Sequence, residues 1–232
     1  LSDCGIAFRT VRYGPTSIAE LAILLLLNAC RPAITNIAPS VRAGKCALRP
    51  QHVGREICGM RVAVIGVGAT GARVARVLLA MGAEVRCFDK MLEHAYLEYA
   101  GDLEELLSWS EAATLHLPLN EETHHIIGRR ELLEFVRPGW ILVNTGRGEL
   151  VDSDALLEAL ENGQIAKAGL DVVEGERGAF YKDSDDLKKN FANLSKLVNH
   201  PNVTCTGHSG YLTKEALQRI ANGVIEHLIY FN

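Results

Sequence analysis

The amino-acid sequence predicts an α/β fold built on a doubly wound parallel sheet. From residue 61 onward, short apolar runs alternate with amphipathic stretches of helical length. Several of the short runs are apolar on both faces, which is typical of parallel strands that helices cover on both sides. A glycine-rich turn separates the first run from the first amphipathic stretch. These observations favour repeated strand–helix units of the Rossmann kind.

Each element follows from its local pattern. A helix over residues 152–163 has Asp152 or Ser153 as a candidate N-cap and Gly163 at its C-terminal end. The polar residues 176–194 predict a long loop or a short-helix excursion. We further expect helices over residues 69–82, 103–110 and 129–139. We expect strands over residues 61–68, 84–89, 112–119, 140–146, 167–173 and 203–208.

Composition and charge narrow the choice of partners. The formal net charge is −4 and lysine and arginine form no cluster, so we expect no nucleic-acid partner. The most apolar stretch, residues 18–30, is too short to span a bilayer and contains Glu20 and Asn28. We therefore expect a buried or interface helix there, and no membrane partner. No secretory signal opens the chain, so a cytoplasmic location is expected.

Cysteine and histidine usage predicts no metal site. The six cysteines are scattered without a C-x-x-C pair, which is typical of free thiols in a reducing compartment. The eight histidines show no metal-ligand spacing.

The glycine-rich turn indicates a dinucleotide site. Gly66, Gly68 and Gly71 lie where a predicted strand gives way to a predicted helix, the context that gives G-x-G-x-x-G its value. The first glycine permits the tight turn, the second lets the backbone approach a pyrophosphate, and the third lets the helix pack on the strand. Free N–H groups at the helix start can then bind the phosphates. Asp89 closes the second strand, where an acid binds the adenosine ribose and repels a 2′-phosphate, so NAD is favoured over NADP.

Four further motifs follow in order: LHLPLNEETHHIIG, ILVNTGRGELVD, GLDVVEGE and TCTGHSGYLT. With them the chain resembles the D-isomer-specific 2-hydroxyacid dehydrogenase family, from YGPTSIAE at residue 13 to the terminal helix. The stretch DVVEGERGAFYKDS is similar to a loop of the D-lactate dehydrogenase branch. The resemblance implies an NAD-dependent oxidoreductase. It would interconvert a D-2-hydroxy acid, with D-lactate expected, and its 2-keto acid by hydride transfer.

The resemblance also implies a domain organisation. Residues 15–206 would form the NAD-binding Rossmann domain. Residues 1–14 would be a remnant of a second, substrate domain, to which a C-terminal helix in residues 207–232 returns. Family members carry a longer segment before YGPTSIAE, so we expect the N-terminal part of the substrate domain to be missing here. The helix over residues 18–30 matches one that the family uses in dimerisation, so a homodimer or a subunit of a larger assembly is expected.

The resemblance assigns the reaction to three side chains. Arg147 matches the substrate-binding arginine, whose planar fork can hold a carboxylate and polarise the adjacent keto oxygen. His208 matches the acid/base, which gives a proton to the carbonyl as hydride arrives at carbon. Glu176 matches its carboxylate partner, which would keep the ring protonated to higher pH. Glu174, two positions away, is the rival for this partner role.

The same matches imply contacts with NAD. Asp171 matches the aspartate near the nicotinamide, at the carboxyl end of a strand, where ligands gather in open α/β sheets. We interpret His116, His124 and His125 as structural or cofactor-adjacent. The full set of expected cofactor-binding residues is Gly66, Gly68, Ala69, Thr70, Gly71, Asp89, His116, Pro118, Thr145, Gly146 and Asp171.

The chain departs from the family at Gly207, where the family usually places proline before the histidine. Glycine frees a backbone angle that proline would fix, so His208 is expected to be less preorganised. This departure and the missing segment motivate a second hypothesis, a non-catalytic NAD-binding subunit or sensor derived from the family. A third hypothesis keeps the enzyme and changes the 2-keto acid to glyoxylate or hydroxypyruvate.

Overall fold

The centre of the fold is a parallel sheet of seven strands, in the order β3-β2-β1-β4-β5-β6-β7. The computed structural model describes residues 11, 14–31, 37–91, 94–178, 180 and 192–230. This arrangement confirms the predicted doubly wound α/β fold. The strands are β1 Arg61–Ile65, β2 Glu84–Phe88, β3 Glu98–Tyr99, β4 Ala112–Leu115, β5 Trp140–Asn144, β6 Ile165–Leu170 and β7 Val203–Cys205.

Five of these strands lie within predicted ranges, and β6 overlaps its range but begins two residues earlier. Each of the six is shorter than predicted. The predicted C-terminal ends instead form loops at the carboxyl edge of the sheet, where the glycine turn also lies. The seventh strand, β3, was missed because two residues leave no readable alternation.

The helices are α1 Thr16–Cys30, α2 Ala38–Arg42, α3 Ala69–Ala80, α4 Leu103–Trp109, α5 Ser153–Glu161, α7 Ala192–Val198 and α8 Lys214–Tyr230. Short turns of helix form η3 Pro50–His52, η4 Glu131–Phe135 and η5 Gly148–Leu150. The helix predicted over residues 129–139 is thus mainly the single π-turn η4. Asp152 is the N-cap of α5, because its side chain accepts from the backbone N–H groups of Asp154 and Ala155.

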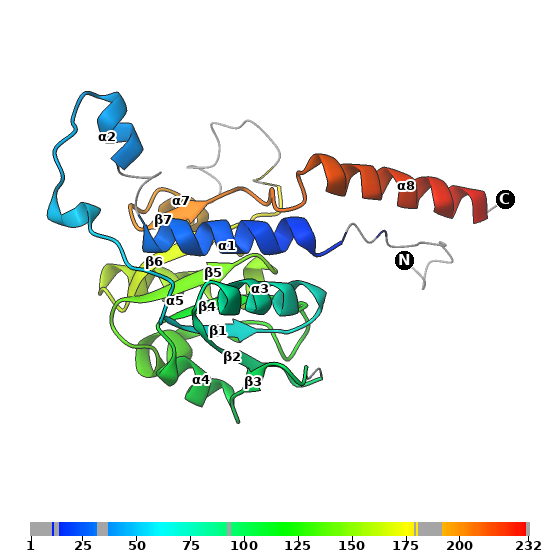
Figure 1. The fold of residues 1–232 in the computed structure, drawn as a ribbon, viewed down its shortest axis with the longest axis horizontal. Helices are drawn as coiled ribbons and strands as arrows, with labels where there is room; N and C mark the ends of the chain where they lie inside the picture. Colours follow the sequence, from blue (N-terminus) through cyan, green and yellow to red (C-terminus); the bar gives the residue numbers. More distant parts are fainter. Residues whose placement is uncertain are drawn as a thin grey trace.

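The sheet is buried on both faces, as its apolar strands predict. In β1, Val62 and Val64 face one core with α1 and α3, while Ala63 and Ile65 face the other with α4, α5 and α7. Figure 1 shows α1 lying along one side of the sheet near α3. The apolar helix α1 is therefore a buried helix of this chain, although Leu24 on it is half exposed.

The C-terminal helix α8 projects away from the sheet (Figure 1). It carries five exposed large apolar side chains: Leu217, Val224, Ile225, Leu228 and Ile229. Most of the predicted remnant, residues 1–14, lies outside the described residues.

The described part of the chain also bears on the state of the cysteines and on the presence of membrane-spanning helices. The described cysteines, Cys30, Cys46, Cys58, Cys87 and Cys205, are free thiols, as predicted. Burial raises the pKa of the Cys30 thiol to about 11 and that of Cys87 to about 12. Among the described residues, no helix combines the length and the apolar character needed to cross a bilayer.

Candidate functional site

Two cavities lie at the carboxyl edge of the sheet, where the strand order turns from β1 to β4. One has a volume of about 250 Å³ and the other about 360 Å³. They share His116, Leu117 and Pro118, which follow β4, so they meet at this segment. A ligand that is long and bent at its middle, as a dinucleotide is, could occupy both. The switch point of a doubly wound sheet is where such ligands bind.

The glycine turn has the geometry that its spacing predicts. Gly66 has φ +89°, a left-handed angle that favours glycine. A Cβ at Gly71 would lie 1.9 Å from the carbonyl oxygen of Gly66. Only a residue without a side chain allows α3 to approach the end of β1 this closely.

The N-terminus of α3 is available to an anion. Its N-cap, Gly68, has no side chain, and no side chain caps this end of the helix. A Cβ at Gly68 would have no atom within 4 Å, so the space above the turn is open. The first-turn residues Ala69 and Thr70 therefore present backbone N–H groups toward that space, and these groups can bind phosphate.

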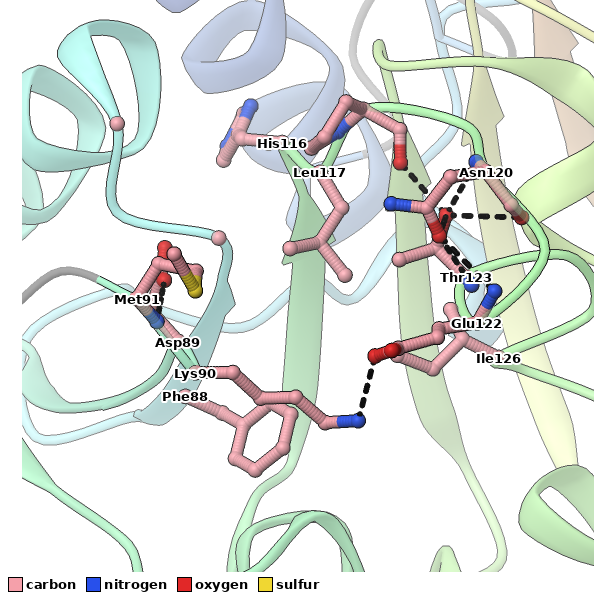
Figure 2. Close-up of a pocket in the computed structure, with 13 residues that line it drawn as sticks. Phe88, Asp89, Lys90, Met91, His116, Leu117, Asn120, Glu122, Thr123 and Ile126 are labelled. Carbon is pink, nitrogen blue, oxygen red and sulfur yellow. Dashed lines mark hydrogen bonds and ion pairs between the residues drawn. The ribbon is translucent and has the colours of Figure 1, made fainter.

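Asp89 closes β2 beside the glycine turn, as predicted. Its Oδ2 accepts from the N–H of Val67 at 2.8 Å, and its Oδ1 accepts from the N–H of Met91 at 2.8 Å. The carboxylate is therefore fixed in the wall of the smaller cavity. Figure 2 shows Asp89 on one side of this cavity and Leu117 on the other, and Lys90 and Glu122, which also line it, form an ion pair of 3.0 Å.

Two buried polar atoms near the junction have no hydrogen-bond partner in the described part of the chain: His116 Nδ1 and Thr145 Oγ1. The other ring nitrogen of His116, Nε2, lies 2.9 Å from Thr114 Oγ1. Burial lowers the pKa of His116 to about 3, so the ring is neutral at physiological pH. Unpartnered buried polar atoms are costly, and a ligand with polar groups at this position would satisfy them.

The larger cavity gathers side chains from distant parts of the chain. Arg147, before η5, is exposed and lines it, and its Nη1 donates to the carbonyl of Gly146 at 2.7 Å. No carboxylate of the described residues pairs with this guanidinium. His208, which follows β7, lines the same cavity with Thr70, Thr145 and Asp171.

The imidazole of His208 is paired with Glu176. Its Nδ1 lies 2.5 Å from Glu176 Oε1, while Glu176 Oε2 accepts from the N–H of Val173 at 2.7 Å. The rival, Glu174, instead lies with its Oε1 2.7 Å from Nε2 of His125. The geometry therefore favours Glu176 as the partner of His208.

Asp171 holds the loop that carries His208. Its side chain is almost fully buried and accepts from Thr206 Oγ1 at 2.6 Å and from the N–H groups of Ser209 and Gly210 at 2.8 and 3.0 Å. Its backbone carbonyl accepts from the N–H of His208 at 2.6 Å. The loop is thus bonded at four points on either side of the histidine.

Gly207 has a backbone angle that the family's usual proline cannot adopt. Its φ is +65°, and that of His208 is +57°, whereas the proline ring holds φ near −65°. At Gly207 the backbone before His208 therefore has a positive φ, which proline could not adopt. Asp171 bonds this loop through Thr206, Ser209 and Gly210, so hydrogen bonds hold the loop at the place where the family usually has proline.

Sequence reasoning missed several cavity residues. These are Leu117 in both cavities, Ile18, Leu119 and Tyr211 in the larger one, and Phe88, Lys90, Met91, Asn120, Glu122, Thr123 and Ile126 in the smaller one. Lys90, Met91 and Asn120 come directly after predicted strands, so their position could have suggested them. All eleven residues expected at the cofactor lie at the cavities except Gly71, which packs α3 onto β1, and Ala69, which starts that helix.

Comparison with known proteins matches this geometry to one family. Residues 23–210 match the family described as D-isomer specific 2-hydroxyacid dehydrogenase, NAD binding domain. A relative named D-specific alpha-keto acid dehydrogenase, from Enterococcus faecalis, is 37% identical over 98% of this chain and 69% of its own length.

Solved structures give the same result. The pyruvate reductase of Chlamydomonas reinhardtii superposes with a TM-score of 0.87 at 35% identity, over 95% of this chain and 68% of that one. The D-lactate dehydrogenase of Lactobacillus jensenii, solved with NAD+, superposes with a TM-score of 0.81 at 35% identity. That match covers 90% of this chain and 63% of the other, so the chain spans about two thirds of these proteins.

Proposed function

The chain belongs to the D-isomer-specific 2-hydroxyacid dehydrogenase family, and we propose that it interconverts D-lactate and pyruvate with NAD as the hydride carrier. The observation that carries the proposal is the convergence of Arg147 and the His208–Glu176 pair on one cavity. That cavity adjoins the one beside the glycine turn, so substrate and nicotinamide would meet at the junction.

The residues at the two cavities fit NAD. The N–H groups at the start of α3 would hold the pyrophosphate, and Asp89 would hold the adenosine ribose. The unpartnered Thr145 Oγ1 and His116 Nδ1 would meet polar groups toward the nicotinamide end. When bound there, NAD supplies the acceptor or donor of the hydride.

The side chains of the larger cavity would do the remaining chemistry. Arg147 would bind the substrate carboxylate through its two parallel N–H donors and polarise the keto oxygen beside it. With Nδ1 held by Glu176, Nε2 is the nitrogen through which His208 would deliver a proton to that oxygen. In the reverse direction it would take the hydroxyl proton back. Glu176 would fix the ring plane and stabilise its protonated form.

The choice of lactate over glyoxylate or hydroxypyruvate is the finer part of the proposal. It is supported by the relatives named for D-lactate dehydrogenase and pyruvate reductase, and by the loop after Glu176 noted in the sequence. Ile18, Leu119 and Tyr211 also line this cavity and would contribute to discrimination among these acids.

Self-association belongs to the same proposal. Exposure of the apolar side chains of α8 and of Leu24 on α1 to water is unfavourable. A second copy of the chain would cover some of these side chains. Sedimentation velocity measures this directly. A single species at the monomer mass across a wide concentration range would overturn the homodimer.

The activity test uses the natural full-length protein with NADH and a panel of pyruvate, glyoxylate and hydroxypyruvate. We expect oxidation of NADH with the largest kcat/KM for pyruvate, and a product that a D-lactate-specific assay detects. A larger kcat/KM for either other acid would overturn lactate and keep the reaction class. Fluorescence titration that finds NADH binding without turnover on any of the three would overturn the enzyme and favour the non-catalytic NAD-binding subunit.

A further inference from the structure

A cluster of metal-ligating side chains lies outside the residues that line the two cavities. We propose that His124, His125 and Glu174 form a binding site for a zinc ion. The sequence predicted no metal site, because the histidine spacing shows no motif. The third ligand lies 49 positions from His125, and only the fold brings the two together. The proposal does not depend on the dehydrogenase reaction.

The donor atoms of the three side chains converge. One ligand atom from each lies within 4.8 Å of the others. His125 Nε2 and Glu174 Oε1 are 2.7 Å apart, and the two imidazole ring centroids are 4.0 Å apart. Zinc bonds of about 2.0–2.2 Å place tetrahedral ligand atoms roughly 3.3 Å from one another. The ion would therefore enter between His125 and Glu174 and draw His124 inward by a small movement.

An unusual backbone conformation brings the two adjacent histidines together. His125 has φ +50°, a left-handed angle that is uncommon for residues other than glycine. In an extended chain, neighbouring side chains point to opposite sides. Here the turn places the two rings side by side, with an interplanar angle of 32°.

Hydrogen bonds hold the turn and the carboxylate in place. Asn120 Oδ1 accepts from the N–H groups of Glu122 and Thr123 at 3.0 and 2.9 Å, and Figure 2 shows this part of the turn. The N–H of His125 donates to the carbonyl of Glu149 at 2.9 Å. Glu174 Oε2 accepts from the N–H of Ser153 at 3.2 Å, which leaves Oε1 turned toward His125. Such fixed outer contacts orient ligands for a metal.

The ligand set favours zinc among the common divalent ions. Imidazole nitrogen suits Zn²⁺, and two histidines with one glutamate form a known zinc set that leaves a fourth position for water. His124 is exposed, so that position opens to solvent. Mg²⁺, which prefers oxygen ligands, does not match the two imidazoles.

A zinc ion bound at this site would also affect the segment that carries Glu176, the proposed partner of His208. Glu174 is two residues before Glu176, whose carboxylate accepts from the N–H of Val173 and contacts His208. A zinc ion would tie the turn after β4 to this segment and restrict its movement. The expected result on folding is a higher melting temperature in the presence of zinc, because the ion binds only the folded arrangement.

The test is calorimetric titration of the metal-free protein with zinc chloride, compared with magnesium chloride, and with melting temperature as a second readout. The decisive variant is His124→Ala, because His124 is exposed and its removal leaves the His125–Glu174 contact intact. His227→Ala, in the last turn of α8, is the matched control, since it removes one histidine elsewhere.

We expect one zinc ion per chain, a melting temperature that rises with zinc, and no heat with magnesium. His124→Ala should weaken zinc binding at least about tenfold and abolish the rise, while His227→Ala should match the parent protein. Glu174→Gln should weaken binding as well, because the amide is a poor zinc ligand. Equal affinity of the parent and His124→Ala would overturn the proposal, and so would the absence of any zinc binding by the parent.

Discussion

The two cavities that meet at His116 are built in opposite ways. The smaller one is made chiefly by chain segments that follow β1, β2 and β4 directly, and its key residues, Gly66, Gly68 and Asp89, lie within one strand–helix–strand unit. The larger one takes Arg147 from beyond β5, His208 from beyond β7 and Thr70 from α3. The part of the site beside the glycine turn and Asp89 thus depends mainly on one strand–helix–strand unit, whereas the nicotinamide end and the proposed reaction depend on the assembled sheet.

The two cavities should respond to different kinds of substitution. A local site depends on backbone approach at a few glycines, so added atoms damage it. A site assembled from distant elements depends on side-chain functional groups and on the loops that aim them. Substitutions in the two cavities should therefore have separable effects on NADH affinity and on turnover.

The largest expected effect is on turnover. His208→Asn removes the acid/base and retains a residue that tolerates the left-handed backbone at φ +57°. We expect kcat to fall by about 10²–10⁴-fold, the usual contribution of a positioned acid/base, while NADH affinity stays within about twofold. Steady-state kinetics and NADH fluorescence titration measure the two quantities. A variant that keeps its kcat would remove His208 from the mechanism.

The glycine turn should respond differently at two of its positions. Gly71→Ala adds a Cβ that would lie 1.9 Å from the Gly66 carbonyl oxygen, so α3 must shift and we expect a loss of about 1–3 kcal/mol in unfolding free energy. Gly68→Ala adds a Cβ to open space and should fold as well as the parent, yet weaken NADH binding. Urea unfolding without cofactor, followed by NADH titration, separates the two. Equal unfolding midpoints for both variants would contradict the close packing of α3 on β1.

Cofactor choice should depend on the charge of Asp89. Asp89→Asn removes the negative charge that would repel a 2′-phosphate. It also weakens the hydrogen bonds to the ribose, because a hydrogen bond to a charged group contributes about 1.5–3 kcal/mol. We expect NADH binding to weaken roughly tenfold and NADPH binding to strengthen. Glu121→Gln, an exposed acid on the loop after β4 that does not line the cavity, is the control and should leave the NADH-to-NADPH ratio unchanged. An unchanged ratio in Asp89→Asn would mean that another feature selects the cofactor.

A further prediction is a pH dependence of stability at the junction of the cavities. Burial lowers the pKa of His116 from about 6.5 to about 3, so between these values the unfolded chain binds more protons than the folded one. The unfolding free energy should therefore fall as the pH drops through this window, by up to about 1.4 kcal/mol per pH unit. Urea unfolding at several pH values across the window measures this. A plot of unfolding free energy against pH should have a shallower slope for His116→Asn than for the parent. Parallel slopes would indicate that His116 is already protonated or solvated in the fold.

Much of the fold was readable from the sequence because its signals are local. Runs such as RVAVI and WILVN mark strands buried on both faces, and the glycine turn marks the first strand–helix junction. The sequence missed strand β3, which has only two residues. The helix predicted over residues 129–139 ends at residue 135 and is mostly the π-helix η4. The roles of the predicted site residues and the cytoplasmic location remain predictions.

The parallel sheet, the dinucleotide turn and the family could be predicted from the residues alone, because each depends on residue types at fixed short spacings. The sequence named both Glu174 and Glu176 as possible partners of His208, and could not choose between them. Only the tertiary structure decided that Glu176 contacts His208 while Glu174 contacts His125. It also decided that Asp171 holds the loop where Gly207 stands in place of proline. The physical reason is that side-chain hydrogen bonds act over a few ångströms, and the fold alone sets which residues come that close.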